Sequence, residues 1–285
     1  MTMRRRWFLL GLAAAGGCVL PAIRELTLPS RYNLVREQLV IHSDFPLPPN
    51  HRLLEELTAR RGDLAEQLAL PRVDEPVHIY LFQDSDRFKT FLSLYHPDFP
   101  QRRAFFLETD TRLEVYAQWG DYVAEDLRHE VCHGYLHAVV PGVPLWLDEG
   151  LAEYSEAPRG HHGIHRSHLA NLKRRIEKEN WQPNLPRLDH FAPNRDMSQD
   201  EYAEAWAWTH FLLKTRPELL SLVRTYLAEL RRNGAAEGLS PRMHRMLERP
   251  DLEVNAHVRR LIQQNAWQQL PDPASADTAS AEGRH

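Results

Sequence analysis

Residues 122–140 read YVAEDLRHEVCHGYLHAVV, and this stretch divides the chain into two parts. It has the length and the apolar spacing of a helix. Before it, strand-like and helix-like segments alternate, and after it only helix-like segments follow. The sequence therefore predicts an α+β protein in which an α/β lobe over residues 31–120 precedes a mainly helical lobe over residues 121–270.

The N-terminal lobe is expected to contain a small mixed sheet. Alternating apolar and polar residues, and short runs rich in Val, Ile, Tyr and Phe, predict its strands. Leucines at helical spacing predict the first helix, which Pro71 ends. The predicted strands are residues 33–43, 77–82, 104–107 and 113–119, the last two joined by a polar turn, and the predicted helices are residues 52–70 and 85–95.

The rest of the chain shows helical periodicity up to its last segment. Residues 271–285 are rich in Ala, Ser and Asp and have no apolar pattern, which predicts a disordered tail. The helices predicted in the C-terminal lobe are residues 122–140, 145–155, 167–179, 198–214, 217–232 and 254–267.

Composition excludes several classes of protein. The chain has 285 residues, of which 42% are hydrophobic, so it has material for a packed core. A formal net charge of −4 without a long basic block argues against nucleic acid as the main partner. Two cysteines exclude a disulfide scaffold, and Cys132 is expected to be a small buried hydrophobe. Sixteen histidines direct attention to metal binding.

The strongest chemical signal is the run H-E-x-x-H at residues 129–133. On a helix, His129 and His133 lie one turn apart, so both imidazoles can reach one zinc ion. Glu130 then lies beside the metal, where it can act as a general base on water. By chance the run arises in roughly 7% of chains of this composition, so alone it is only suggestive.

A second segment supports the first. Residues 145–154 read LWLDEGLAEY and follow the zinc-binding run after a short loop. Catalytic zinc needs a third protein ligand and an open position, and a carboxylate on this neighbouring helix can supply the ligand.

With both motifs in place, the sequence resembles the gluzincin metallopeptidases. It is most similar to the exported bacterial peptidase MA-like family, whose members pair H-E-x-x-H with W-L-x-E-G-x-A-E-Y. The resemblance extends over about residues 33–215. It implies a zincin-like α+β fold in which residues 31–270 form one catalytic unit.

The resemblance also implies roles for further residues. Glu149 would be the third zinc ligand. Glu153 would hydrogen-bond a zinc-bound histidine, and it is the alternative ligand if Glu149 points away. Tyr202, or else His210, would donate a hydrogen bond to the developing oxyanion, although each is as readily explained by packing on an amphipathic helix. Residues 113–119 would be the edge strand along which a peptide substrate binds, and an ordinary sheet strand is the alternative.

The weaker signals have structural explanations. His137 continues the stripe of 129 and 133, but we expect it to be packed or solvated. Residues 161–168, HHGIHRSH, suggest a mobile loop that leads into a helix and binds metal at most adventitiously. The metzincin pattern is excluded because Leu136 and Val139 stand where it needs Gly and His. No motif supports a cofactor other than zinc.

The N-terminus predicts export. Residues 1–20 combine a basic start with a short apolar stretch, as a signal segment does. Residues 5–9, RRWFL, resemble the twin-arginine signal, and residues 15–18, AGGC, are similar to a bacterial lipobox that would place a lipid on Cys18. An ordinary signal peptide and an uncleaved anchor are the alternatives. We expect a periplasmic or cell-envelope protein, with membrane attachment through lipidated Cys18 or the apolar segment.

Taken together, these residues favour an exported zinc metallopeptidase that acts on peptides or proteins. A catalytically silent zinc-stabilised peptide-binding module is the second hypothesis. The third is a structural envelope lipoprotein in which the H-E-x-x-H run is fortuitous.

Overall fold

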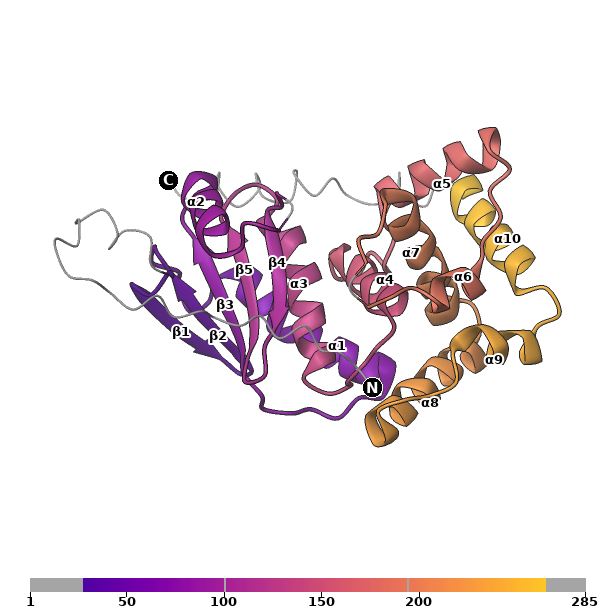
Figure 1. Cartoon of the computed structure of the whole chain (residues 1–285), viewed down its shortest axis with the longest axis horizontal. Coiled ribbons are helices and arrows are strands. Elements are labelled where there is room, and N and C mark those ends of the chain that lie inside the picture. Colours follow the sequence, from indigo (N-terminus) through magenta and orange to yellow (C-terminus); the bar gives the residue numbers. More distant parts are fainter. Residues whose placement is uncertain (1–27, 100, 194, 265–285) are drawn as a thin grey trace.

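A computed structural model describes residues 28–99, 101–193 and 195–264, and it has the predicted α+β architecture. Figure 1 shows a sheet with its covering helices on one side of the molecule and a helical lobe on the other, with helices α3 and α4 between them. The expectations for the export segment, for Cys18 and for the tail after residue 270 lie outside the described residues.

The sheet is mixed, as expected. Its strands are ordered β1-β2-β3-β5-β4. The central pairs β2–β3 and β3–β5 are parallel, and the outer pairs β1–β2 and β4–β5 are antiparallel. The strands are β1 (Tyr32–Arg36), β2 (Leu39–Ser43), β3 (Val77–Phe82), β4 (Ala104–Glu108) and β5 (Leu113–Gln118).

The expected single strand over residues 33–43 is wrong, because the chain reverses there. Arg36 pairs with Leu39, so Glu37 and Gln38 form a two-residue hairpin turn. Glu37 adopts a φ of 49°, the positive value that such tight turns use. Arg61 on the neighbouring helix lies 3.2 Å from the Glu37 carboxylate. The turn has no glycine or proline, and the alternating pattern continues through it, so the sequence does not mark the reversal.

The expected edge strand is also wrong. Residues 113–118 form β5, which pairs with β3 on one side and with β4 on the other. Because β5 runs parallel to β3 and takes the place beside it, the hairpin partner β4 is left on the outside. The edge next to α3 is therefore β4.

The helices predicted from the sequence are present, with ends that differ by a few residues. Two short helices, α6 and α9, were not predicted, because one or two turns are too short for a periodic pattern. The helices are α1 (Arg52–Leu68), α2 (Ser85–Tyr95), α3 (Val123–His137), α4 (Leu145–Glu156), α5 (Arg166–Lys178), α6 (Leu185–Asp189), α7 (Gln199–Lys214), α8 (Pro217–Asn233), α9 (Leu239–Met246) and α10 (Pro250–Gln263). No helix of the described residues is long and apolar enough to cross a membrane.

Both faces of the sheet are covered. Alternate side chains of a strand point to opposite faces. In β3, Val77 and Ile79 join the core that includes α1 and α3, whereas Tyr80 and Phe82 join an aromatic cluster that includes Phe88 of α2. This arrangement explains why β3 reads as a continuous apolar run.

A glycine sets the position of α3 on the sheet. A Cβ atom built at Gly134 would lie 2.7 Å from Cγ1 of Val77, which is too close for two carbon atoms. The absence of a side chain at residue 134 therefore lets α3 approach β3.

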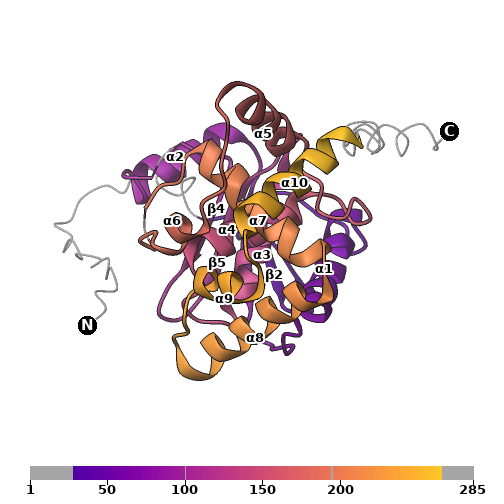
Figure 2. The same cartoon turned by 90° about the vertical axis from the view of Figure 1, so that its right-hand side faces the viewer.

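Helix α7 forms the centre of the helical lobe. Trp206, Trp208 and Phe211 are almost completely buried. Figure 2 shows α7 near the middle of the lobe with the other helices around it. Helix α4 packs closely on α7, where a Cβ at Gly150 would lie 2.8 Å from the backbone oxygen of Ala205. Through this contact the lobe fixes α4 opposite α3.

Candidate metal centre

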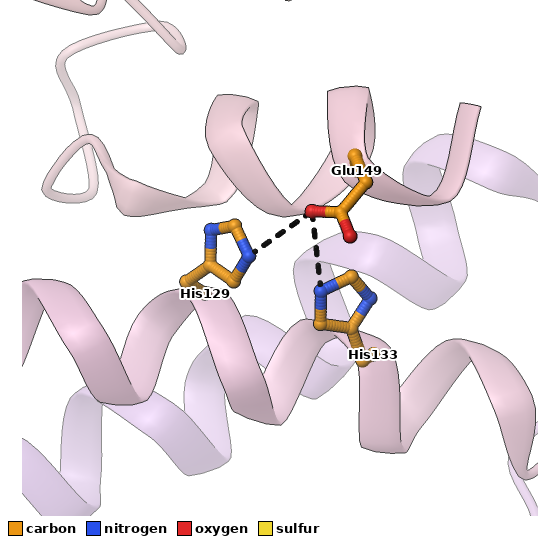
Figure 3. A group of neighbouring side chains, drawn as sticks. All are labelled: His129, His133 and Glu149. Carbon is orange, nitrogen blue, oxygen red and sulfur yellow. Dashed lines mark ion pairs between the residues drawn. The ribbon is translucent and has the colours of Figure 1, made fainter. Parts of the chain in front are cut away.

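His129 and His133 on α3 face Glu149 on α4, as Figure 3 shows. Oε2 of Glu149 lies 3.4 Å from Nε2 of His129 and 3.8 Å from Nε2 of His133. In a tetrahedral site with metal–ligand bonds of about 2.1 Å, two ligand atoms are about 3.4 Å apart. The three side chains are therefore spaced as ligands of one metal ion.

Both imidazole rings are oriented by a second carboxylate. Nδ1 of His129 lies 2.7 Å from Oε1 of Glu156, and Nδ1 of His133 lies 3.0 Å from Oδ1 of Asp148. A carboxylate beside Nδ1 favours a proton on that nitrogen and leaves the lone pair of Nε2 free for a metal. The donor set and its surroundings thus fit a divalent cation.

The electrostatics of the centre favour positive charge. Burial opposes protonation of His129, but hydrogen bonds with Glu149 and Glu156 outweigh it and hold its pKa well above the ordinary value. Burial likewise opposes protonation of His133, and the charge of Asp148 raises its pKa nevertheless. The carboxylates around these rings create a negative potential, and a bound cation would be stabilised by it.

Glu130 lies beside the same group. Its carboxylate pKa is raised chiefly by burial, and the charges of His129 and His133 partly offset this effect. A buried carboxylate with a raised pKa has the properties of a general base. The structure thus brings Glu130 next to the three expected ligands.

The structure places Glu153 differently from the expectation. Its Oε2 lies 2.7 Å from Nε2 of His168 on α5, and the carboxylates beside Nδ1 of His129 and His133 belong to Glu156 and Asp148. The physical reason is the position of the neighbouring helix α5. Glu153 is one turn beyond Glu149, and the start of α5 places His168 beside it as a closer partner.

Of the two candidate oxyanion donors, Tyr202 is close enough to the centre for the charge of Glu149 to act on its phenol. Burial raises the pKa of its phenol, and the charge of Glu149 raises it further. His210 instead lies in the core of the helical lobe, with Nδ1 2.9 Å from Nε2 of His257. The packing explanation therefore holds for His210.

His137 is neither solvated nor simply packed. Its Nε2 lies 2.9 Å from Oδ2 of Asp148, and its Nδ1 lies 2.8 Å from Oε2 of Glu108. Asp148 thus bridges His133 and His137 at hydrogen-bond distances. The ring of Phe106 on β4 also stacks beside that of His133, at 5.8 Å between centroids. The edge strand is therefore in direct contact with the centre.

Cys132 is buried, as expected, and contributes no charge to the centre. Ser155 Oγ lies 3.4 Å from its sulfur, and burial raises the pKa of the thiol to about 11.

Three functional candidates were missed from the sequence. Asp148 and Glu156 orient the histidines, and the charge of Arg102 acts on both Glu130 and Tyr202. Asp148 directly precedes Glu149 in the second motif, and this position could have indicated its role beside His133. Nothing in the sequence marks Glu156 or Arg102.

Comparison with known proteins finds a partial match to a family without an assigned activity. Residues 125–232 match the model of a family described as a protein of unknown function, DUF1570. The match covers less than half of the chain, but it contains His129, Glu130, His133 and Glu149. No curated protein matches the sequence.

Proposed function

We propose that the protein is a zinc-dependent metallopeptidase. The observation that supports this proposal best is the arrangement of His129, His133 and Glu149, with Oε2 of Glu149 3.4 and 3.8 Å from the two Nε2 atoms, while Glu130 lies beside them. Two imidazoles and one carboxylate are a ligand set typical of catalytic zinc, which leaves one position open. Zinc bound there would polarise a substrate carbonyl and make a water molecule acidic.

The residues of the chain would then perform the proton transfers. The Glu130 carboxylate takes a proton from the attacking water and passes it to the nitrogen of the departing amine. Tyr202 donates a hydrogen bond to the oxygen that gains negative charge, and such donors contribute about 3 kcal/mol of transition-state stabilisation. Arg102 contributes positive charge near both groups.

The edge strand supports a peptide as the substrate. Among the residues that the structure describes, β4 pairs only with β5, and the ring of its Phe106 stacks beside that of His133. An extended peptide that adds to the free side of β4 would pass beside the centre, with backbone hydrogen bonds that do not depend on its sequence.

Export remains part of the proposal. Its support is the sequence of residues 1–20, with the twin-arginine-like run and the lipobox-like run that ends at Cys18. In this proposal the enzyme acts in the periplasm or at the cell envelope, attached through Cys18 or through the apolar segment.

The test is cleavage of a diverse peptide pool by the zinc-loaded full-length chain in mild detergent. We expect cleavage that a chelator abolishes and that Glu130→Gln slows by about 10²- to 10⁴-fold while zinc stays bound. Glu55→Gln, at an exposed position on α1, is the matched control and should cleave like the parent. Equal rates in the parent and Glu130→Gln would contradict the proposal. Binding of peptides without any cleavage would favour the peptide-binding module.

A further inference from the structure

A second group of histidines and glutamates lies between α4 and α5. Glu153 and Glu156 are on the last turn of α4, and His165 and His168 are at the start of α5. All four side chains are largely buried, with 10%, 15%, 13% and 6% of their surfaces exposed. Both histidines belong to the segment HHGIHRSH at residues 161–168, which the proposed function does not use.

The polar atoms of this group converge. Oε2 of Glu153 lies 2.7 Å from Nε2 of His168 and 3.5 Å from Nε2 of His165. Oε2 of Glu156 lies 2.7 Å from Nε2 of His165. The rings of His165 and His168 are stacked, with centroids 3.9 Å apart, and both Nε2 atoms lie near Oε2 of Glu153. Glu153, His165 and His168 thus offer three ligand atoms within 4.8 Å of one another.

These distances are close to those of a metal site. The 3.5 Å separation already equals the ligand spacing of tetrahedral zinc, whereas each 2.7 Å contact would have to open by about 0.7 Å. Small side-chain rotations suffice for such a change. With zinc on Nε2, the proton of His165 moves to Nδ1, where Ser167 Oγ at 3.2 Å can accept it. This change breaks the long hydrogen bond, of 3.3 Å, that the backbone N–H of His168 donates to the same nitrogen.

Charge gives an independent reason for a cation. Two carboxylates are buried here against two imidazoles, and buried charges are stable when they are paired or coordinate a metal. The guanidinium of Arg128 is already engaged by the Glu56 carboxylate and the backbone oxygen of Glu156. A divalent ion would neutralise the two carboxylates directly.

We propose that Glu153, Glu156, His165 and His168 bind a second zinc ion with a structural role. Three ligand atoms, from Glu153, His165 and His168, already lie together. Glu156, whose Oε2 lies 2.7 Å from Nε2 of His165, would complete the four protein ligands that are typical of structural zinc. The ion would clamp the end of α4 to the start of α5, across a loop that Trp206 also holds by a hydrogen bond of 2.9 Å to Gly163. This proposal does not depend on peptide hydrolysis, although Glu156 also contacts His129 of the first centre.

Glu156 would link the two sites. Its Oε1 contacts Nδ1 of His129 and its Oε2 contacts Nε2 of His165. One carboxylate would thus orient a ligand of the first ion and bind the second, so the sites are adjacent but use separate ligand sets.

The experiment counts zinc bound to the full-length chain after loading with zinc and removal of loosely held metal. We expect two ions in the parent and one in the His165→Ala/His168→Ala variant. His129→Ala/His133→Ala should also retain one. His162→Asn is the matched control, because His162 is an exposed histidine of the same loop with a φ of 55°, which Asn tolerates. It should retain both ions.

A second variant guards against loss of folding. Glu153→Gln keeps the size of the side chain and removes its charge, and we expect it to lose the second ion selectively while its circular dichroism stays unchanged. Cobalt in place of zinc gives an absorption spectrum for each tetrahedral site, so the spectral contribution of one site should disappear with it.

The outcomes distinguish the two proposals. A parent chain with one ion that the His165/His168 and Glu153 variants retain would overturn the second site. Such a group would then be only a hydrogen-bonded network. A single ion that these variants lose, and that the His129/His133 variant keeps, would support the second site and overturn the first centre.

Discussion

Asp148 and Glu156 determine the orientation of the His133 and His129 rings toward a metal. Each carboxylate contacts Nδ1 of one ring, at 3.0 Å for His133 and 2.7 Å for His129, and so turns Nε2 toward Glu149. Asp148 also contacts His137, so its position is fixed from two sides. The orientation of the ligands therefore depends on residues that do not themselves face the metal position.

This orientation gives the first prediction. Asp148→Asn keeps the shape of the side chain but removes the charge that holds the proton on Nδ1 of His133. We expect zinc affinity at the first centre to fall by about 10- to 100-fold, measured by competition with a coloured chelator. Asp63→Asn, which removes an exposed carboxylate paired with Arg159, should leave the affinity unchanged. Equal affinities for the parent and Asp148→Asn would refute the role of Asp148.

At the scale of single residues, the sequence predicted those contacts that helical spacing alone determines. His129, Glu130 and His133 are brought together by one helix, so their proximity follows from local periodicity. The partners of Glu153 depend on where the start of α5 lies relative to the end of α4, which is a tertiary contact. The sequence predicts a mobile loop at residues 161–168, because it does not show this tertiary contact. In the structure, His165 and His168 lie against Glu153 of α4.

At the scale of elements, the centre exists because α3 and α4 are each held by a close contact to a neighbour. α3 is held against β3 at Gly134, and α4 is held against α7 at Gly150. The sequence predicted these helices well, because their apolar periodicity is long. It did not predict the turn at Glu37 or the outer position of β4, because strand order and unmarked reversals are set by pairing between distant segments.

The packing of α4 gives the second prediction. A Cβ at Gly150 would lie 2.2 Å from Oγ1 of Thr209 and 2.8 Å from the backbone oxygen of Ala205, so Gly150→Ala must push α4 away from α7. We expect the free energy of unfolding in urea to fall by about 1–3 kcal/mol, together with weaker zinc binding because Glu149 moves. Gly120→Ala is the control, since a Cβ there meets nothing within 4 Å. A variant as stable as this control would show that the contact is not tight.

At the scale of the whole molecule, a buried pair of histidines joins helix α10 to the centre of the helical lobe. Nδ1 of His210 on α7 lies 2.9 Å from Nε2 of His257 on α10. Lys214 and His162 act electrostatically on His210, and the ring of Tyr154 lies 6.0 Å from its ring between centroids. The pair is distant in sequence, and its role could not be recognised before the two helices were placed side by side.

The pair should make the stability of the fold depend on pH. Burial, together with the charge of the other histidine and of Lys214, lowers the pKa of His210 to about 3. Burial, together with the charge of Arg260, lowers the pKa of His257 to about 4. In the unfolded chain both titrate near the ordinary value of 6.5. Between that value and the folded pKa values, the unfolded state therefore binds protons that the folded state does not.

The third prediction follows from this sign. Above pH 6.5 both histidines are neutral in both states, and lowering the pH from 7 to 5 should cost roughly 2 kcal/mol of unfolding free energy per histidine, or roughly 4 for the pair. Urea unfolding of the full-length chain at the two pH values measures the loss. In His257→Gln, whose amide can still bond to His210, the loss should shrink by roughly 2 kcal/mol. His190→Gln, at an exposed position, should behave like the parent. An equal loss in the parent and His257→Gln would mean that α10 docks on α7 without any contribution from this pair to the pH dependence.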